Sequence, residues 1–398
     1  MNIKIISLQS DCKSWDDYAY SSPSSSPYHL SAWKNVVSSI YGHNTYCLIA
    51  LRQWCAEHYF SYSRICRCQA QAMDKYEENG DQEVVGIFPF VQITHWLFGS
   101  SLSSMPFCDS GGVLAKDENT ERMLIEQGLW IANTLRVPVL ELRQYQPLAC
   151  LDDQEFVGES SLYGTREVKS VPNWYVSVLP DSNKVRMLVD LSGDPDALIK
   201  SFKPKLRSQI RKPIKEGLTA KIGGVELVDD FYNVFAENMR DLGSPVHSKK
   251  FIAETLKAFP NTANVFIVYG DRKPLAGSVT IGFKDTLSNP LASSLRRYSH
   301  LAPNMLLYWS MLEFACQQGY KRFDFGRSTT GEGTYKFKEQ WGAKPEPLYW
   351  YCFSKTNDQG WGGQPNKDKM SKAIEYWKKL PVPLTKIIGP RIRKYISL

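Results

Sequence analysis

The sequence predicts a mixed α/β fold (α+β in its strand arrangement) built from two similar units. The chain has 398 residues, a length that favours two domains. Hydrophobic residues make up 43% of the chain and charged residues 22%, so most of it can bury a core and fold. Segments with strand and helix patterns also alternate twice along the chain, in a similar order.

The first unit is expected over residues 1–180. Runs rich in apolar and β-branched residues predict strands at 46–53, 83–94 and 138–144. Apolar residues at helical spacing predict a helix over 121–136. Pro89 falls inside the second strand, which places that strand at a sheet edge or a bulge. Residues 54–81 are polar and cysteine-rich and are expected to form an inserted loop.

The second unit is expected over residues 181–356. Ser192 or Asp194 is positioned to cap a helix with Pro195 in its first turn. Gly319 ends a long, nearly all-apolar helix that begins at residue 305. An amphipathic helix and six strands complete the unit, the helix at 227–242 and the strands at 185–191, 264–270, 274–284, 291–299, 321–326 and 348–354.

The basic charge of the chain is concentrated in a C-terminal tail, residues 357–398. The formal net charge is +7, and nine Lys or Arg with two acids between residues 367 and 398 account for all of it. Such a tail suggests an anionic partner, namely nucleic acid, a phospholipid surface or a phosphorylated carrier. The tail is expected either to lie on a membrane surface or to be solvated or folded back on the body.

The sequence contains no metal-site or export signal. The nine cysteines include no CxxC pair, so we expect no metal site and reduced, mostly buried thiols. The N-terminal segment reaches Asp11 without an apolar core, unlike a secretory signal. No stretch approaches the ~20 apolar residues that span a bilayer. We expect a cytoplasmic protein, peripheral at the inner membrane if the tail contacts lipid.

The stretch FDFGRSTTGEGTYKFKEQWGAKP, residues 323–345, is the first candidate for chemistry. Gly326 and Gly331 have the spacing of a P-loop, but Glu332 stands where that motif requires lysine. The DFG tripeptide is that of kinases, whose other motifs are missing. The loop at 327–334 is instead expected to follow a strand, where ligands sit in α/β sheets.

Residues on either side of this loop are candidate ligand-binding groups, namely Arg327, Ser328 and Tyr335. The chain is then expected to return as a strand with Phe337 pointing inward and Lys336 and Lys338 on the opposite face. A lysine held there could balance a phosphate or a developing oxyanion. The alternative is that both lysines are solvated surface residues.

Three further segments carry candidate polar groups. Lys203, Arg207 and Arg211 recur every fourth residue, so they line one helical face that either binds phosphate or is simply solvated. Asp241 and His247 follow the amphipathic helix and are candidates for a general base, against a structural or surface role. Candidate anion-binding groups also surround the start of the apolar helix, whose free amides would suit an anion: Arg296, Arg297 and Asn304.

Four segments together resemble one family: KPKLRSQIRKPIKEG, NMRDLGSPVHSKKF, LAPNMLLYWSMLEFACQQGYKRFDFGRS and GTYKFKEQWGAKPEPLYW. In order and spacing they are similar to the FemAB-related acyltransferases. More narrowly, they resemble a bacterial subgroup associated with exosortase (PEP-CTERM) exopolysaccharide systems. The resemblance implies two GNAT-like domains, each a mixed, mostly antiparallel sheet flanked by helices, packed around a shared cleft.

The resemblance also implies acyl, aminoacyl or peptidyl transfer to an amine. The Phe-Lys pair of the family's last motif matches Phe337 and Lys338, and this lysine is expected to support the donor or the tetrahedral transition state. The family's phosphate contacts map loosely onto Arg207 and Arg211. The acceptor is then an amine on a phosphorylated or nucleotide-linked sugar or peptide of the cell envelope, and no DNA partner is expected.

One departure from the pattern leaves the donor open. GNAT acetyltransferases carry [RQ]xxGx[GA] to bind the CoA pyrophosphate, but residues 297–304 read RYSHLAPN and contain no glycine. The co-substrate is therefore expected to be either acyl-CoA or aminoacyl-tRNA, with no tightly bound cofactor. A different class of function is a binding or scaffold protein that kept the fold and lost catalysis.

Overall fold

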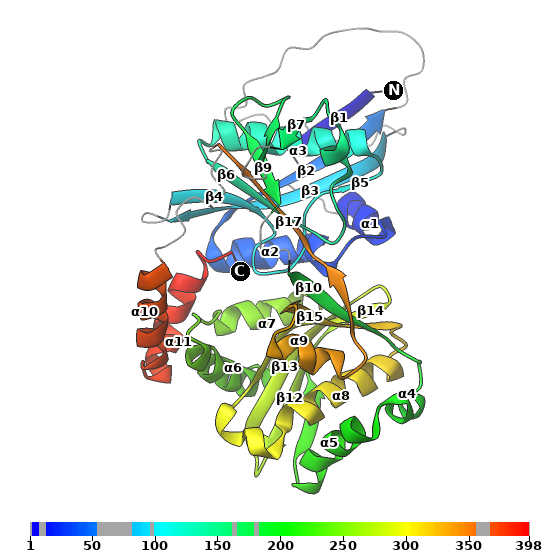
Figure 1. Cartoon of the computed structure of the whole chain (residues 1–398), viewed down its shortest axis with the longest axis vertical. Coiled ribbons are helices and arrows are strands. Elements are labelled where there is room, and N and C mark those ends of the chain that lie inside the picture. Colours follow the sequence, from blue (N-terminus) through cyan, green and yellow to red (C-terminus); the bar gives the residue numbers. More distant parts are fainter. Residues whose placement is uncertain are drawn as a thin grey trace.

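The computed structural model of the chain describes residues 2–7, 13–53, 82–95, 99–160, 165–178, 183–355 and 367–397. They form two mixed sheets that follow one another along the long axis of the molecule, each covered by helices (Figure 1). The predicted mixed α/β class is confirmed. The inserted loop expected at 54–81 lies outside the described residues.

The first sheet has ten strands among the described residues, in the order β1-β2-β3-β4-β6-β17-β9-β8-β7, with β5 paired to β3. Its strands are β1 (Asn2–Ser7), β2 (Asn44–Gln53), β3 (Gln82–His95), β4 (Gly99–Ser104), β5 (Leu114–Ala115), β6 (Val139–Gln144), β7 (Val157–Ser160), β8 (Thr165–Val168), β9 (Tyr175–Val178) and β17 (Tyr349–Ser354). β17 comes from the far end of the second unit and pairs antiparallel with both β6 and β9.

Helices cover both faces of the first sheet. α3 (Glu118–Thr134) begins where the Asp117 carboxylate accepts the Thr120 backbone N–H, and it packs Leu124 and Leu129 on one face. α1 (Lys13–Ser21) and α2 (Ser31–Tyr41), joined through the short η1 (Pro27–His29), lie on the other face. A second short 3-10 turn, η2 (Ala149–Asp152), follows β6.

The second sheet has seven strands among the described residues, in the order β11-β12-β13-β14-β15-β10-β16. They are β10 (Lys184–Asp190), β11 (Thr219–Gly223), β12 (Ala263–Gly270), β13 (Lys273–Phe283), β14 (Thr286–Ser294), β15 (Arg322–Thr329) and β16 (Lys344–Pro347). Within this sheet only β14 and β15 run parallel to each other, as the described pairs show.

Two sets of helices sandwich the second sheet. α8 (Pro303–Gln317) packs on one face, with α4 (Pro195–Ser201) and α5 (Pro204–Lys215) against it and α9 (Gly333–Glu339) at its side. The opposite face carries α6 (Val228–Leu242), led in by η3 (Val225–Leu227), and α7 (Lys249–Ala258). The short η4 (Arg296–Leu301) connects β14 to α8.

One hydrophobic core joins the two halves. The Trp33 ring of α2 lies 5.8 Å from the Phe251 ring of α7, and the Tyr41 ring stacks on Phe251 at 5.4 Å between centroids. The same buried cluster continues to Val279 and Ile281 of β13. The face of the second sheet that carries α7 therefore packs directly on α2 of the first half.

The basic tail is folded back on the body. Residues 367–397 form α10 (Lys367–Lys378) and α11 (Val382–Arg393), which pack against α6 (Figure 1). Arg393 is largely buried, and Lys386 donates a hydrogen bond to Asn233 at 2.6 Å. Of the alternatives for the tail, folding back is the one observed. Across the described segments, no helix is long and apolar enough to cross a bilayer.

Three local expectations differ from the structure. The strand expected at 291–299 ends at Ser294, and the chain continues as η4 because Arg296 and the residues after it leave the sheet. Residues 335–338 form part of the helix α9 rather than a strand, with Phe337 packed 5.1 Å from the Tyr308 ring. Pro89 lies in an internal strand, but at a gap on one side between the pairings of β3 with β5 and with β4.

Candidate active site

Lys338 is a buried lysine held by two backbone carbonyls. It lies on α9 with 7% of its surface exposed. Its Nζ donates hydrogen bonds to the Gly326 carbonyl at 3.0 Å and the Arg327 carbonyl at 2.7 Å. Burial lowers the pKa of Lys338 to about 8, while the charges of Asp324 and Asp109 oppose that shift. A third N–H of the ammonium remains to be directed at a ligand.

Asp324 is the buried carboxylate nearest in chain to these carbonyls. It is 4% exposed on β15, and its Oδ1 accepts the Gly326 N–H at 2.7 Å. Burial raises the pKa of Asp324, and the charge of Arg186 works against that rise. A carboxyl of raised pKa beside a lysine of lowered pKa is the environment that tunes groups for proton transfer.

Arg186 connects this carboxylate with the first half of the chain. It lies on β10, and its Nε and Nη2 donate to one oxygen of Glu346 at 2.9 and 2.6 Å. Its guanidinium lies 4.0 Å from the centre of the Tyr145 ring, a cation–π distance. Tyr145 follows β6 in the first sheet, so the contact spans the two halves.

Asp109 makes the second connection between the halves. Its carboxylate lies 3.4 Å from Arg327 Nη1, and its backbone carbonyl accepts the Trp350 indole N–H at 3.1 Å. The Trp350 ring has the guanidinium of Arg327 at 5.1 Å and that of Arg143 at 5.7 Å. We call the charged and aromatic residues gathered here the interdomain cluster: Asp109, Tyr145, Arg186, Asp324, Arg327, Lys338 and Trp350.

The strands β14 and β15 separate beside this cluster. They pair in parallel only from Thr286–Ser288 to Arg322–Asp324. Beyond that point β14 stays with β13 and β15 stays with β10. Three buried polar atoms near the separation find no hydrogen-bond partner among the described residues: Asn289 Nδ2, Ser293 Oγ and Ser328 Oγ. Because an unpaired buried polar group costs about 1–3 kcal/mol, these atoms are suited to a ligand with amide or hydroxyl groups.

The other candidates of the 323–345 stretch divide between the cluster and its support. Arg327 belongs to the cluster, and Ser328 lies at the separation of the strands. Phe337 packs against Tyr308 and Trp341, and Tyr335 is half-buried in the same core. Lys336 is exposed, so it does not share a face with Lys338. A helix explains this, since residues two apart diverge by about 200°.

The basic helix lies elsewhere. Arg207 and Arg211 line an open depression of about 570 Å³ on α5, and Lys203 is exposed at the start of that helix. Figure 1 shows α5 at the end of the molecule remote from the first sheet, whereas α9 and β15 lie beside β17. The structure therefore does not bring this cationic face to Lys338.

Arg296, Arg297 and Asn304 lie where β14 passes into α8. Arg296 and Asn304 are exposed, and Arg297 forms an ion pair with Glu237 of α6. Ala302 has φ +55 at the N-cap, and Pro303 supplies no N–H in the first turn. The end of α8 thus offers fewer amide donors than a glycine-rich turn would.

Asp241 and His247 lie apart from the interdomain cluster. Asp241 pairs with Arg240 at 2.6 Å near the end of α6. His247 is buried, with Nδ1 2.6 Å from the Tyr41 hydroxyl and Nε2 accepting from Arg393 Nε at 3.0 Å. Burial and the charge of Arg393 lower its pKa well below the usual value. Both ring nitrogens are engaged, which favours the structural alternative for this histidine.

Sequence reasoning missed five members of the interdomain cluster: Asp109, Tyr145, Arg186, Asp324 and Trp350. Asp324 belongs to the DFG tripeptide, but the identity of these three residues does not predict that the aspartate carboxylate is buried. The one available signal for Asp109 was its place in the turn-rich MPFCDSGG segment.

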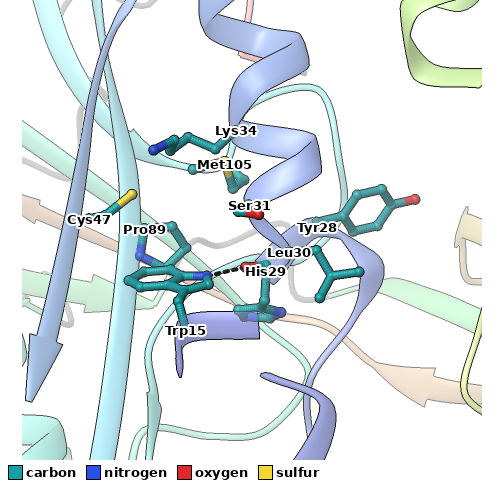
Figure 2. Close-up of a pocket in the computed structure, with 9 residues that line it drawn as sticks. All are labelled: Trp15, Tyr28, His29, Leu30, Ser31, Lys34, Cys47, Pro89 and Met105. Carbon is teal, nitrogen blue, oxygen red and sulfur yellow. Dashed lines mark hydrogen bonds between the residues drawn. The ribbon is translucent and has the colours of Figure 1, made fainter. Parts of the chain in front are cut away.

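The cavity beside His29 in the first half does not form an alternative site, because it has no room for a water molecule. Figure 2 shows its lining, with the Trp15 indole donating to the His29 carbonyl at 2.6 Å. Among the described residues no group of three His, Cys, Asp or Glu side chains could hold a metal ion.

A comparison with known protein families finds a match in the part of the chain that carries Lys338. Residues 201–339 match the acetyltransferase (GNAT) domain family. That range includes β14, β15, α8 and all of α9. No curated protein is similar in sequence at a significant level.

Solved structures extend the likeness to the whole fold. FemX aligns with a TM-score of 0.59 and 12% identity, over 87% of this chain and 96% of FemX. A tandem GNAT protein from the clavulanic acid biosynthesis pathway aligns at 0.45 and 9%, over 90% of this chain and all of that one. The C-terminal domain of a putative lysylphosphatidylglycerol synthetase from Agrobacterium fabrum aligns at 0.45 and 13%, over 73% and 84%. The FemX alignment shows a shared overall fold.

Proposed function

We propose that this chain, whose residues 201–339 match the GNAT acetyltransferase domain family, is an acyltransferase of the FemAB type. It would transfer an acyl or aminoacyl group to an amine of an envelope polysaccharide or peptidoglycan-like acceptor. The observation that carries the proposal is the buried Lys338 ammonium, held by the Gly326 and Arg327 carbonyls where β14 and β15 separate. The envelope acceptor, and the narrower exosortase-associated subgroup, rest on the sequence resemblance alone.

The donor in this proposal enters between β14 and β15. GNAT acetyltransferases use acyl-CoA, whose pantetheine arm carries two amides that could pair with the buried polar atoms of Asn289, Ser293 and Ser328. Aminoacyl-tRNA is the other donor, and the cationic face of α5 would then hold its phosphates. The same face could instead hold the phosphates of a nucleotide-linked acceptor.

The chemistry would divide between two buried groups. The acceptor amine attacks the acyl carbonyl carbon, and Asp324 takes the proton that the nitrogen loses. The free N–H of Lys338 stabilises the oxyanion of the tetrahedral intermediate. Collapse of the intermediate expels the CoA thiolate or the ribose oxygen of tRNA, and Asp324 gives its proton to that leaving group, which restores the carboxylate. Neither Asp241 nor His247 has a role in this scheme, because neither reaches the interdomain cluster.

A binding or scaffold role in an exopolysaccharide or protein-sorting assembly at the inner membrane is the alternative. In that role the basic tail would contact lipid, with exposed apolar side chains such as Ile387 at 57% exposure. The raised pKa of Asp324 and the lowered pKa of Lys338 favour catalysis, because a scaffold has no need of a carboxyl and a lysine buried close together.

Exchange of Lys338 for methionine tests the proposal. Lys338→Met keeps the length and packing of the side chain and removes the ammonium, so transfer should fall ~100-fold or more, the usual cost of losing an oxyanion donor. Lys336→Met, two residues away and exposed, is the matched control and should keep activity. Melting temperatures with acetyl-CoA, a longer acyl-CoA and aminoacyl-tRNA would first identify the donor.

Wild-type turnover in Lys338→Met would overturn the assigned mechanism. A wild-type chain whose melting temperature no donor raises, and which transfers no acyl group, would support the scaffold role instead.

A further inference from the structure

The last described residues of the chain run into the face between the two sheets. After α11 ends, the Ser397 carbonyl accepts hydrogen bonds from the Phe107 backbone N–H at 2.7 Å and from Arg143 Nη1 at 3.0 Å. The Ser397 hydroxyl donates to Glu141 Oε2 at 3.4 Å. Two donors and one acceptor thus converge on a single residue, and the C-terminus lies between the two halves in Figure 1.

The groups that receive Ser397 are themselves rigidly held. Arg143 and Glu141 are 1% and 4% exposed on β6, and Arg143 Nη2 donates to Glu141 at 3.2 Å. Arg143 Nη1 also donates to the Cys108 carbonyl at 3.1 Å. Phe107 has φ +69, a left-handed conformation that is strained for a residue with a side chain. That strained turn directs its N–H at Ser397.

The groups around Ser397, namely Phe107, Arg143 and Glu141, form a subsite whose charges balance, and this favours a neutral ligand. Because Glu141 neutralises Arg143, a phosphate or carboxylate gains little there, whereas a neutral carbonyl and a neutral hydroxyl match the free donors and acceptor. An amide carbonyl beside a hydroxyl donor is what Ser397 itself supplies. The subsite also adjoins the interdomain cluster, since Arg143 and Arg327 flank the same Trp350 ring.

The segment that fills the subsite, residues 394–397, is partly exposed along its whole length. Beyond the bond from Arg393 to His247, the Lys394 carbonyl is 2.7 Å from His43 Nε2, and the Tyr395 ring meets His95 edge-on at 4.4 Å. None of residues 394–397 is fully buried, and a segment exposed in this way opens locally at a fraction of the global unfolding free energy.

We propose that residues 394–397 are a plug, bound in cis, in a subsite that recognises a neutral peptide segment. When the plug is absent, a peptide of the same chemistry binds to Phe107, Arg143 and Glu141 in trans. This inference does not rest on the proposed transfer reaction, because binding alone reports it.

A chain that ends at Arg393 tests the plug and keeps the bond of Arg393 to His247. The probe is a fluorescent, C-amidated peptide KYISL. We expect saturable binding to the shortened chain and at least tenfold weaker binding to the full chain, whose subsite is filled. The peptide KYIAL lacks the serine hydroxyl and should bind about 5-fold more weakly, as the loss of one hydrogen bond worth about 1 kcal/mol predicts. A scrambled peptide, IKLSY, is the control.

Three results would overturn the plug. The first is a folded shortened chain that binds KYISL no better than the scrambled peptide. The second is equal binding by the full and shortened chains, which would place the peptide elsewhere. The third is a shortened chain that fails to fold, because residues 394–397 would then be an integral part of the core. Hydrogen exchange of the full chain adds a check, since the amides of 395–397 should exchange faster than those in α11.

Discussion

Burial lowers the pKa of Lys338 so far that both of its protonation states are accessible near neutral pH. An ammonium in a largely apolar site keeps its proton only through the carbonyls of Gly326 and Arg327 and the charges of Asp324 and Asp109. These interactions do not fully replace the water that burial removes, so its pKa falls to about 8. The group is therefore poised within reach of ordinary working pH.

Transfer should decline in alkaline solution. The scheme requires the ammonium form of Lys338, which is lost above its pKa of about 8, so kcat/KM should fall about tenfold per pH unit beyond that point. Lys338→Arg keeps its charge at all these pH values, and any residual activity it has should lack the decline. A pH–rate profile measures both. Activity that rises above pH 8 would contradict the role, because it would identify the neutral amine as the active form.

The linked effect on folding has the opposite direction. Below pH 8 the folded state carries the cost of a buried ammonium, and that cost is relieved between about 8 and the ordinary lysine value of 10.5. The stability of the wild-type chain relative to Lys338→Met should therefore increase over this pH range.

The sequence predicted Lys338 as a site residue but did not predict most of the residues around it in the interdomain cluster. The Phe-Lys pair is a local pattern, and a local pattern can be read from neighbouring letters. The contact of Asp109 with Arg327 joins residues more than two hundred positions apart, and Arg186 meets Tyr145 across the two sheets. Such pairs are created by tertiary packing, and one sequence contains no signal for them.

The β15 strand and the α9 helix act together as the support of the site. Gly326 interrupts β15 with φ +74, which turns its carbonyl toward Lys338 and brings its backbone close to Asn289. A Cβ at this position would lie 3.1 Å from the Asn289 carbonyl oxygen. Glycine is needed here for both the conformation and the close approach.

Gly326→Ala should therefore cost more than the conformational penalty alone. Gly331→Ala is the matched control, because Gly331 has φ +82 and a Cβ there would meet nothing within 4 Å. The control should lose about 1–2 kcal/mol of unfolding free energy, and Gly326→Ala should lose more and also reduce transfer. Urea unfolding of both variants provides the comparison. Equal losses would mean that β14 simply moves aside.

Element type was predictable where patterns are long and failed where they are short. The apolar helix expected at 305–319 is α8 (Pro303–Gln317), and the strand expected at 46–53 is β2 (Asn44–Gln53). The four residues YKFK alternate as a strand does, yet they form a helix because Phe337 docks between Tyr308 and Trp341. Four residues are too few for the spacing of apolar side chains to distinguish a helix from a strand.

The two halves of the molecule are joined because a strand from the end of the second unit, β17, belongs to the first sheet. The strand at 349–354 was expected in the second unit by its position, but its alternation fits either sheet, and it completes the first. The shared core around Trp33 and Phe251 adds a second connection. The two sheets should therefore unfold together.

Phe353→Ala tests this coupling. Phe353 is fully buried on β17 within the core of the first sheet, and its truncation should cost about 3–5 kcal/mol. We expect a single, shifted unfolding transition in which hydrogen exchange in β12 and β13 accelerates along with that in β3 and β6. Acceleration confined to the first sheet would mean that the halves are thermodynamically separate.

The position of β17 also sets an order of events during synthesis. The gap between β6 and β9 stays empty until Ser354 has been made, 176 residues after β9 ends at Val178. At roughly 5–20 residues per second, the ribosome needs about 10–35 s to supply the missing strand. Through that interval the nascent first half presents two unpaired strand edges, so it is in this window, rather than after release, that the chain most needs protection by a chaperone.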